Sequence, residues 1–252
     1  AAMNNYAYML KEGDGIPVDK QEAIKYYKMA IDKGSPDAMN NYARMLFDGD
    51  GVEVNKEEAI KYFKISADND CTEAMNNYAK ILMNGDGIAA NPEKAIRYYK
   101  MAIAKDHSTA MLNYATMLYI GIGVPIVKEE AIKYFKMSID KGNIDAMIQY
   151  GIILKNENKK EAAKYFKMAI DKGNTFAMCE YATLLNDENK KDESSKYFKM
   201  AIDKGDSRAM YQYAMLLEQE EEVIKYLKLA IDKGYSNAMY QYALLLNEID
   251  KD

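Results

Sequence analysis

The stretch AMNNYARMLFDGDGVEVNKEEAIKYFKISADND, residues 38–70, is followed by a close copy of itself, AMNNYAKILMNGDGIAANPEKAIRYYKMAIAKD, at residues 74–106. The Ala-Met pair that opens each copy recurs along the whole chain, with its alanine at Ala2, Ala38, Ala74, Ala110, Ala146, Ala177, Ala209 and Ala238. Successive copies therefore begin 36, 36, 36, 36, 31, 32 and 29 residues apart. A period in this range predicts a solenoid of tandem helix pairs.

The first half of each copy has the pattern of an amphipathic helix, which we call helix A. With the opening alanine numbered zero, positions 0, 1, 4, 5, 7 and 8 fall within an arc of roughly 160° on a helix. In the second copy these positions hold Ala38, Met39, Tyr42, Ala43, Met45 and Leu46. Position 5 is alanine in every copy except the fifth, where it is Gly151. A small residue at this point predicts that another helix passes close by.

The second half of each copy, helix B, reads EAIKYYKMAIDKG at residues 22–34 and places its apolar and aromatic residues on one face. Its closing glycine favours a left-handed cap. In the first four copies a G-x-G-V/I loop joins the two helices, as at Gly49 and Gly51. The later copies lack this loop but keep both helical patterns, so we expect the fold to continue through them.

Two residue types recur with the repeat. Tyrosine occupies position 4 of helix A and the Tyr26 position of helix B, and the helical phase turns both toward the core. Lysine or arginine pairs recur on the other face of helix B, as at Lys25 and Lys28. We interpret these pairs as a solvated outer face, with an acidic partner as the alternative.

These features together resemble the Sel1-like repeat, a longer-looped relative of the tetratricopeptide repeat. The residues that carry the resemblance are the small residue at position 5, the leucine at position 8, the G-x-G loop and the A-x-x-aromatic-x-x-x-A pattern of helix B. The resemblance covers nearly all of residues 1–252 and weakens after Leu154; position 4, usually leucine in the family, is tyrosine here. It implies an all-α, right-handed α-solenoid that acts as an adaptor or scaffold, with no catalytic residue.

Composition excludes several other classes. Acidic residues outnumber basic ones 39 to 34, which gives no reason to expect a nucleic-acid partner. No stretch approaches the 18 apolar residues of a membrane span, and no basic-then-apolar signal pattern opens the sequence. Cys71 and Cys179 are too few for a disulfide scaffold, so we expect a cytoplasmic location, with the nucleus and the ER lumen left open. With His107 as the single histidine, we expect no enzyme activity, no metal and no cofactor.

A partner-binding surface is expected on helix A, because in superhelices of this kind the A helices line the concave wall. Positions 2, 3, 6 and 9 point away from the predicted core. Position 3 is Asn, Gln or Glu in every copy. These side chains could bond to the backbone of an extended peptide, or they could link adjacent repeats, and the sequence leaves both open.

Positions 2 and 6 change from polar to apolar along the chain, from Asn40 and Arg44 to Ile148 and Ile152. Either the C-terminal half of the concave wall binds an apolar peptide or helix, or tight curvature buries these residues within the array. The candidate partner-binding residues are Leu112, Asn113, Tyr119, Ile148, Gln149, Ile152, Cys179, Glu180, Tyr211, Gln212, Met215, Tyr240, Gln241 and Leu244.

The sequence thus predicts one solenoid over residues 1–252, with seven helix pairs and a last unpaired helix, that works as a protein–protein interaction scaffold. Because helix B is missing at both margins, we expect a segment of a longer chain, or ends covered by another copy or a neighbouring subunit. One alternative is the regulatory arm of a larger enzyme, for example a kinase or a ubiquitin-pathway component. Another is binding of nucleic acid or phosphoinositide by the lysine face, which added salt would weaken steeply.

Overall fold

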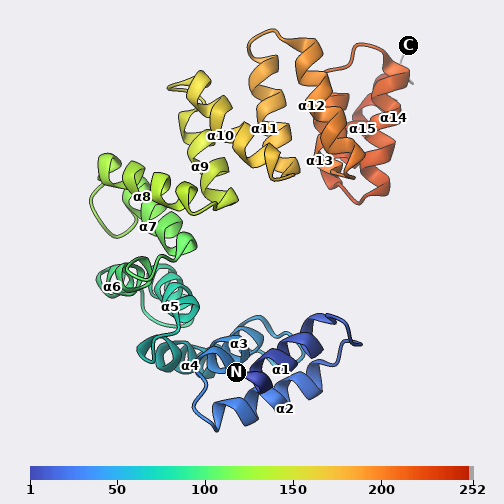
Figure 1. The fold of residues 1–252 in the computed structure, drawn as a ribbon. Helices are drawn as coiled ribbons and strands as arrows, with labels where there is room; N and C mark the ends of the chain where they lie inside the picture. Colours follow the sequence, from blue (N-terminus) through green and yellow to red (C-terminus); the bar gives the residue numbers. More distant parts are fainter. Residues whose placement is uncertain (250–252) are drawn as a thin grey trace. The chain divides into compact units, whose positions relative to one another are not determined.

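The computed structural model describes residues 1–249, and all regular secondary structure in that range is α-helical (Figure 1). The A helices are α1 (Ala2–Glu12), α3 (Pro36–Asp48), α5 (Thr72–Asn84), α7 (Ser108–Ile120), α9 (Ile144–Leu154), α11 (Thr175–Asn186), α13 (Ser207–Ala214) and α15 (Ser236–Ile249). The B helices are α2 (Lys20–Ile31), α4 (Lys56–Asp68), α6 (Pro92–Ile103), α8 (Lys128–Asp140), α10 (Lys159–Asp171), α12 (Lys191–Asp203) and α14 (Glu220–Asp232).

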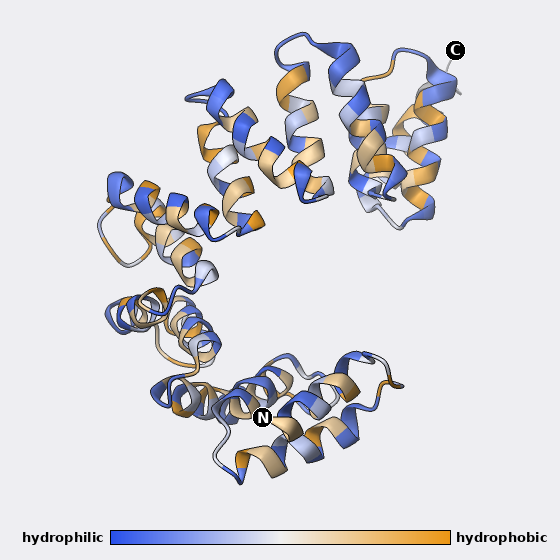
Figure 2. Ribbon diagram, viewed as in Figure 1, coloured by the Kyte–Doolittle hydropathy of each residue, from blue (hydrophilic) through white to orange (hydrophobic). Residues whose placement is uncertain are grey.

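The chain divides into two compact units, residues 1–143 with α1 to α8 and residues 144 onward with α9 to α15. Within each unit every A helix packs on the B helix that follows it, and every B helix packs on the next A helix. Each helix carries both hydrophobic and hydrophilic residues (Figure 2). The predicted all-α solenoid of helix pairs is confirmed, and a single array across both units stays a prediction.

Paired tyrosines join the two helices of each repeat, as their phase predicted. The position-4 ring meets the helix B ring edge-to-face in seven repeats, with centroids 4.8–5.6 Å apart and interplanar angles of 60–86°. From Tyr42 to Tyr213 the position-4 side chains are buried, whereas Tyr6 in the first repeat is exposed. Such pairs add about 0.5–1.5 kcal/mol each beyond the area they bury.

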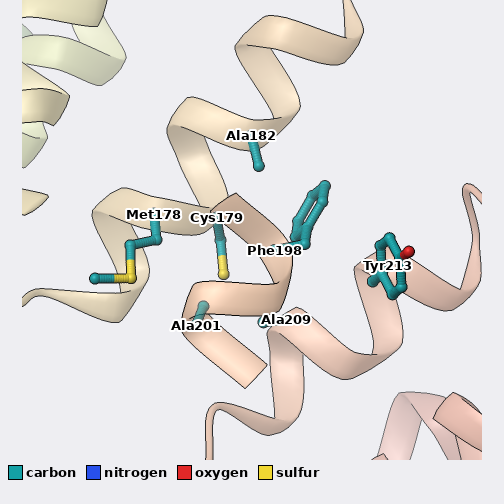
Figure 3. Packing of buried hydrophobic residues seen from close by; sticks show 7 residues of the cluster. All are labelled: Met178, Cys179, Ala182, Phe198, Ala201, Ala209 and Tyr213. Carbon is teal, nitrogen blue, oxygen red and sulfur yellow. The ribbon is translucent and has the colours of Figure 1, made fainter. Parts of the chain in front are cut away.

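Helix contacts at position 5 explain its small residues. In the second unit a Cβ atom on Gly151 of α9 would lie 2.7 Å from Cε1 of Phe166 on α10, so the two helices leave no room for a side chain. Figure 3 shows the equivalent core one repeat on, where Ala182 of α11 lies near Phe198 of α12. Cys179 is buried in the same cluster, together with Ala209 from α13.

The long loops of the first unit reach back onto the preceding repeat. Gly51, in the loop after α3, lies on the first residue of α2, and a Cβ there would be 2.6 Å from the Lys20 Cβ. Gly123 lies equally close to Pro92, the first residue of α6. In the second unit only residues 187–190 separate α11 from α12, and only residues 215–219 separate α13 from α14.

Candidate protein-binding surface

The asparagines at positions 2 and 3 form a ladder between adjacent repeats of the first unit. Each position-3 amide donates to the position-2 amide oxygen of the preceding repeat: Asn41 to Asn4 (3.0 Å), Asn77 to Asn40 (3.0 Å) and Asn113 to Asn76 (2.9 Å). The three acceptor residues are buried. The position-3 residues Asn41, Asn77 and Asn113 therefore link adjacent repeats, which is one of the two alternatives that the sequence left open. Asn113 is one of the candidate partner-binding residues.

The predicted exposure of position 2 is wrong for three candidate residues. Leu112, Ile148 and Cys179 are only 4%, 7% and 0% exposed. Within a unit, position 2 can face the next repeat: the Asn40 side chain accepts a hydrogen bond from Asn77 of the next A helix, and Cys179 packs in one cluster with Ala209 of α13. Of the two alternatives for this strip, burial rather than exposure therefore holds at these three positions.

The two cysteines are unsuited to chemistry that needs a thiolate. Burial raises the pKa of the Cys71 thiol, and it raises the pKa of Cys179 to about 12. Both thiols therefore remain protonated near neutral pH, and a protonated thiol is a poor nucleophile and metal ligand.

Position 6 of the second unit does expose apolar side chains, as the sequence predicted. Ile152 on α9, Met215 after α13 and Leu244 on α15 are each 40% exposed, and Tyr240 at position 2 of the last helix is 69% exposed. These four residues leave apolar side chains exposed on or directly after the A helices of the second unit.

Of the remaining candidate residues, Tyr119 and Glu180 contact neighbouring side chains, and Gln149 and Gln241 differ in exposure. Tyr119 packs against the Phe135 ring at 6.4 Å between centroids, and Lys128 Nζ lies 5.3 Å from the Tyr119 centroid. Glu180 forms an ion pair with Lys155 at 3.3 Å. Gln149 is exposed and Gln241 is half-buried.

The structure brings three candidate residues together in one pocket, which we call the α11–α13 notch. Its volume is about 160 Å³, and its lining residues are Thr183, Asn186, Phe198, Tyr211, Gln212, Met215 and Leu216. Gln212 is one of these lining residues, and its side-chain oxygen Oε1 is buried and has no hydrogen-bond partner among the described residues. The notch therefore combines apolar walls with one unused hydrogen-bond acceptor.

A notch at the equivalent place in the first unit has a different character. It lies between α3 and α5, has a volume of about 210 Å³, and is lined by Arg44, Phe47, Asp48, Phe63, Asn77, Lys80, Ile81, Asn84 and Asp86. All four of Arg44, Lys80, Thr183 and Met215 occupy position 6 of their repeats. Arg44 therefore corresponds to Thr183, and Lys80 corresponds to Met215. The same backbone arrangement thus presents charge in one unit and apolar surface in the other.

Four lining residues of the α11–α13 notch were not among the predicted site residues. Thr183 and Asn186 occupy positions 6 and 9 of the preceding A helix, so the period alone could have identified them. Phe198 belongs to helix B, whose aromatic residue the pattern assigns to the core. Leu216 lies past the end of the short helix α13.

Residues 1–249 hold no group of three or more His, Cys, Asp or Glu side chains arranged to bind a metal ion. Every helix in the same range is too short or too polar to cross a membrane.

Tandem helix pairs of this length, with a small residue at the helix crossing, define a helical-repeat protein of the tetratricopeptide-like type. The Sel1 repeat family matches residues 1–35, 36–71, 72–107, 108–143 and 146–174. The chain belongs to this family, whose members are commonly protein-interaction scaffolds. No curated protein matches the chain.

Solved structures share the fold. A Sel1 repeat protein from Oxalobacter formigenes is 27% identical with a TM-score of 0.71, and the match covers 80% of this chain and 86% of that one. The protective antigen c5321 of uropathogenic Escherichia coli is 22% identical with a TM-score of 0.66, covering 98% and 56%. Yeast Tom70 is 14% identical with a TM-score of 0.69, covering 98% and 55%. The chain therefore spans little more than half the length of the last two proteins.

Proposed function

We propose that the protein is a non-catalytic interaction scaffold, and that the A helices of its second unit bind a partner protein through an apolar side chain inserted into the α11–α13 notch. The observation that carries this proposal is the notch itself, which joins an apolar lining to the unpartnered Oε1 of Gln212. A cavity of about 150 Å³ accommodates a benzene-sized group. The notch therefore fits one leucine, methionine or phenylalanine side chain of a partner.

The buried Gln212 oxygen supports binding of a peptide in particular. An acceptor that is buried without a partner destabilises the free protein by about 1–3 kcal/mol. A backbone N–H group next to the inserted side chain would satisfy this acceptor. Binding thus relieves a cost that the free protein carries.

Peptide selection with matched variants tests the proposal. Peptides are selected from a display library on the intact protein, and their affinities are then measured for Met215→Lys and Leu229→Lys. Leu229 on α14 is 38% exposed, close to the 40% of Met215, so it controls for a new surface charge. We expect selected peptides to carry a large apolar residue and to lose about tenfold or more in affinity with Met215→Lys alone.

Gln212→Met gives a second signature. It removes the unused acceptor and keeps the side-chain length, so stability should stay equal or rise while peptide affinity falls. Peptides that bind both lysine variants and Gln212→Met as well as the original protein would contradict the proposal.

A further inference from the structure

A carboxylate covers the first turn of helix B in the first unit. Asp50, in the loop after α3, lies 2.6 Å from Nζ of Lys20 at the start of α2 and 3.2 Å from Nζ of Lys11. Asp86, in the loop after α5, lies 3.0 Å from Nζ of Lys56 at the start of α4. The loops after α3 and α5 thus each place an aspartate on the lysine that begins the preceding helix B.

At the start of α10 in the second unit the corresponding surface is open, because the connection after α11 is only four residues long. A groove of about 550 Å³ lies between α10 and α11 and includes the start of α10. Its edges carry Lys159, Lys160, Lys164, Lys167 and Lys190 together with Asp171 and Glu188. Its remaining lining is Ala163, Met168, Tyr181, Leu184 and Leu185.

The positive charge of this α10–α11 groove is largely uncompensated. Glu188 is already paired with Lys190 at 2.6 Å. Within the described residues, Lys159, Lys160 and Lys164 form no ion pair with any carboxylate, and all three are exposed. The groove therefore presents three exposed ammonium groups that pair with no carboxylate, although Lys164 Nζ lies 5.6 Å from the centroid of the Tyr165 ring.

The equivalent groove one repeat further on supplies an internal comparison. It lies between α12 and α13, has a volume of about 570 Å³, and is lined by Asp192, Ser195, Lys196, Lys199, Met200, Asp203 and Tyr213. Asp192 occupies the place of Lys160, and Lys191 at the start of α12 is paired with Glu218 at 3.3 Å. The α10–α11 groove therefore has a larger excess of lysine than its counterpart between α12 and α13.

We propose that the α10–α11 groove is a second binding site, which takes an acidic segment of a partner protein. Two long loops of the protein itself show how an acidic segment can bind at the start of a helix B. In each loop an aspartate between two glycines, followed by an aliphatic residue, lies on the first turn of that helix. In the α10–α11 groove a partner's Asp or Glu side chains pair with Lys159, Lys160 and Lys164. An aliphatic neighbour contacts Leu184 and Leu185.

This site is independent of the α11–α13 notch, because the two share no lining residue. The apolar lining and the aspartate precedent favour a peptide over a polyanion such as RNA or an anionic lipid surface. Complementary charge at such an edge raises the association rate and weakens with added salt.

The probe is a fluorescein-labelled peptide of the protein's own loop, FDGDGVEVN, residues 47–55. Its matched control, FNGNGVQVN, replaces each carboxylate by the corresponding amide. Fluorescence anisotropy measures binding to the full chain, to Lys159→Ala/Lys160→Ala/Lys164→Ala, and to the control triple Lys191→Ala/Lys196→Ala/Lys199→Ala. Both triples remove three positive charges from the same unit, and circular dichroism checks that both remain helical.

We expect saturable binding of the acidic peptide that weakens about tenfold or more in the groove triple and less than about twofold in the control triple. A loop graft gives a second test, in which residues 187–190 are replaced by the residues 49–55 sequence GDGVEVN. The grafted loop should occupy the groove and abolish peptide binding. Any one of the following results would overturn the proposal. The acidic peptide shows no saturable binding, the two triples lose affinity equally, or the amide peptide binds equally well. The graft binds the peptide unchanged, or the protein binds single-stranded RNA or phosphatidylserine vesicles in preference to the peptide.

Discussion

The hydroxyl of Tyr98 on α6 donates a hydrogen bond to Oδ1 of Asp68 at the end of α4, with 2.7 Å between the two oxygens. This bond ties the B helices of two successive repeats together. The Tyr98 ring also packs edge-to-face on Tyr78, with 4.9 Å between centroids. One side chain thus joins the two helices of its own repeat and links that repeat to the one before it.

A matched pair of tyrosine substitutions measures the value of that bond. Tyr98→Phe should lower the free energy of unfolding by about 1.5 kcal/mol or more, because it breaks a hydrogen bond to a charged group. Tyr27→Phe should leave stability equal or raise it, because the buried Tyr27 hydroxyl has no partner among the described residues. Urea unfolding measures both, and equal losses in the two variants would contradict the assignment.

Acid should remove the contribution of Asp68. Partial burial alone would raise the pKa of its carboxyl, but the hydrogen bonds from Lys64 and Tyr98 outweigh this effect and hold the pKa below its ordinary value. A lowered folded-state pKa means that the stabilisation is complete above the unfolded value, about 3.9, and is lost as the pH falls through the folded value. The advantage of the original protein over Asp68→Asn in urea unfolding should therefore shrink from about pH 6 to about pH 3. An advantage that is constant or grows in acid would contradict this sign.

Substitutions of two glycines at the same loop position distinguish the cost of backbone strain from the cost of disturbed packing between repeats. Gly15 and Gly123 both have a positive φ, but a Cβ on Gly15 meets nothing within 4 Å, whereas one on Gly123 would lie 2.3 Å from Cγ of Pro92. Gly15→Ala should cost about 1–2 kcal/mol for the left-handed conformation alone. Gly123→Ala should cost clearly more, since Pro92 must also move. Thermal unfolding of the two variants checks the order, and equal costs would show that the loop does not pack on α6.

Both cysteines should resist thiol reagents in the folded protein. Cys179 is fully buried with a pKa raised to about 12, and burial also raises the pKa of Cys71. Titration with a chromogenic disulfide near pH 8 should find no rapidly reacting thiol until denaturant is added, when both react. Fast labelling of Cys179 in the native protein would contradict its position in the core.

The sequence predicted what depends on the period within one repeat. Tyr42 and its equivalents lie in the core because each A helix must bury one face against its own helix B. Gly34, the closing glycine of the first helix B, adopts the left-handed conformation that its place after the apolar pattern indicated.

Contacts between repeats were harder to predict. Position 2 lies outside the apolar arc of a single helix, so the sequence offered Ile148 and Cys179 as surface residues, but both are buried, and Cys179 packs against the next repeat. The missing loops were visible in the sequence. The sequence did not show that the missing loop leaves the start of α10 open. This became apparent only from the structure, in which Gly51, in a long loop of the first unit, contacts Lys20 at the start of α2.

Hydrogen–deuterium exchange of the protein with and without a selected apolar peptide tests the central claim most directly, namely that the A helices of the second unit are the recognition surface. The account predicts slower exchange on peptide binding in α11 and in residues 207–217, which include α13 and Leu216, with α14 unchanged. Protection confined to the exposed faces of the B helices, with none in α11 or α13, would contradict it.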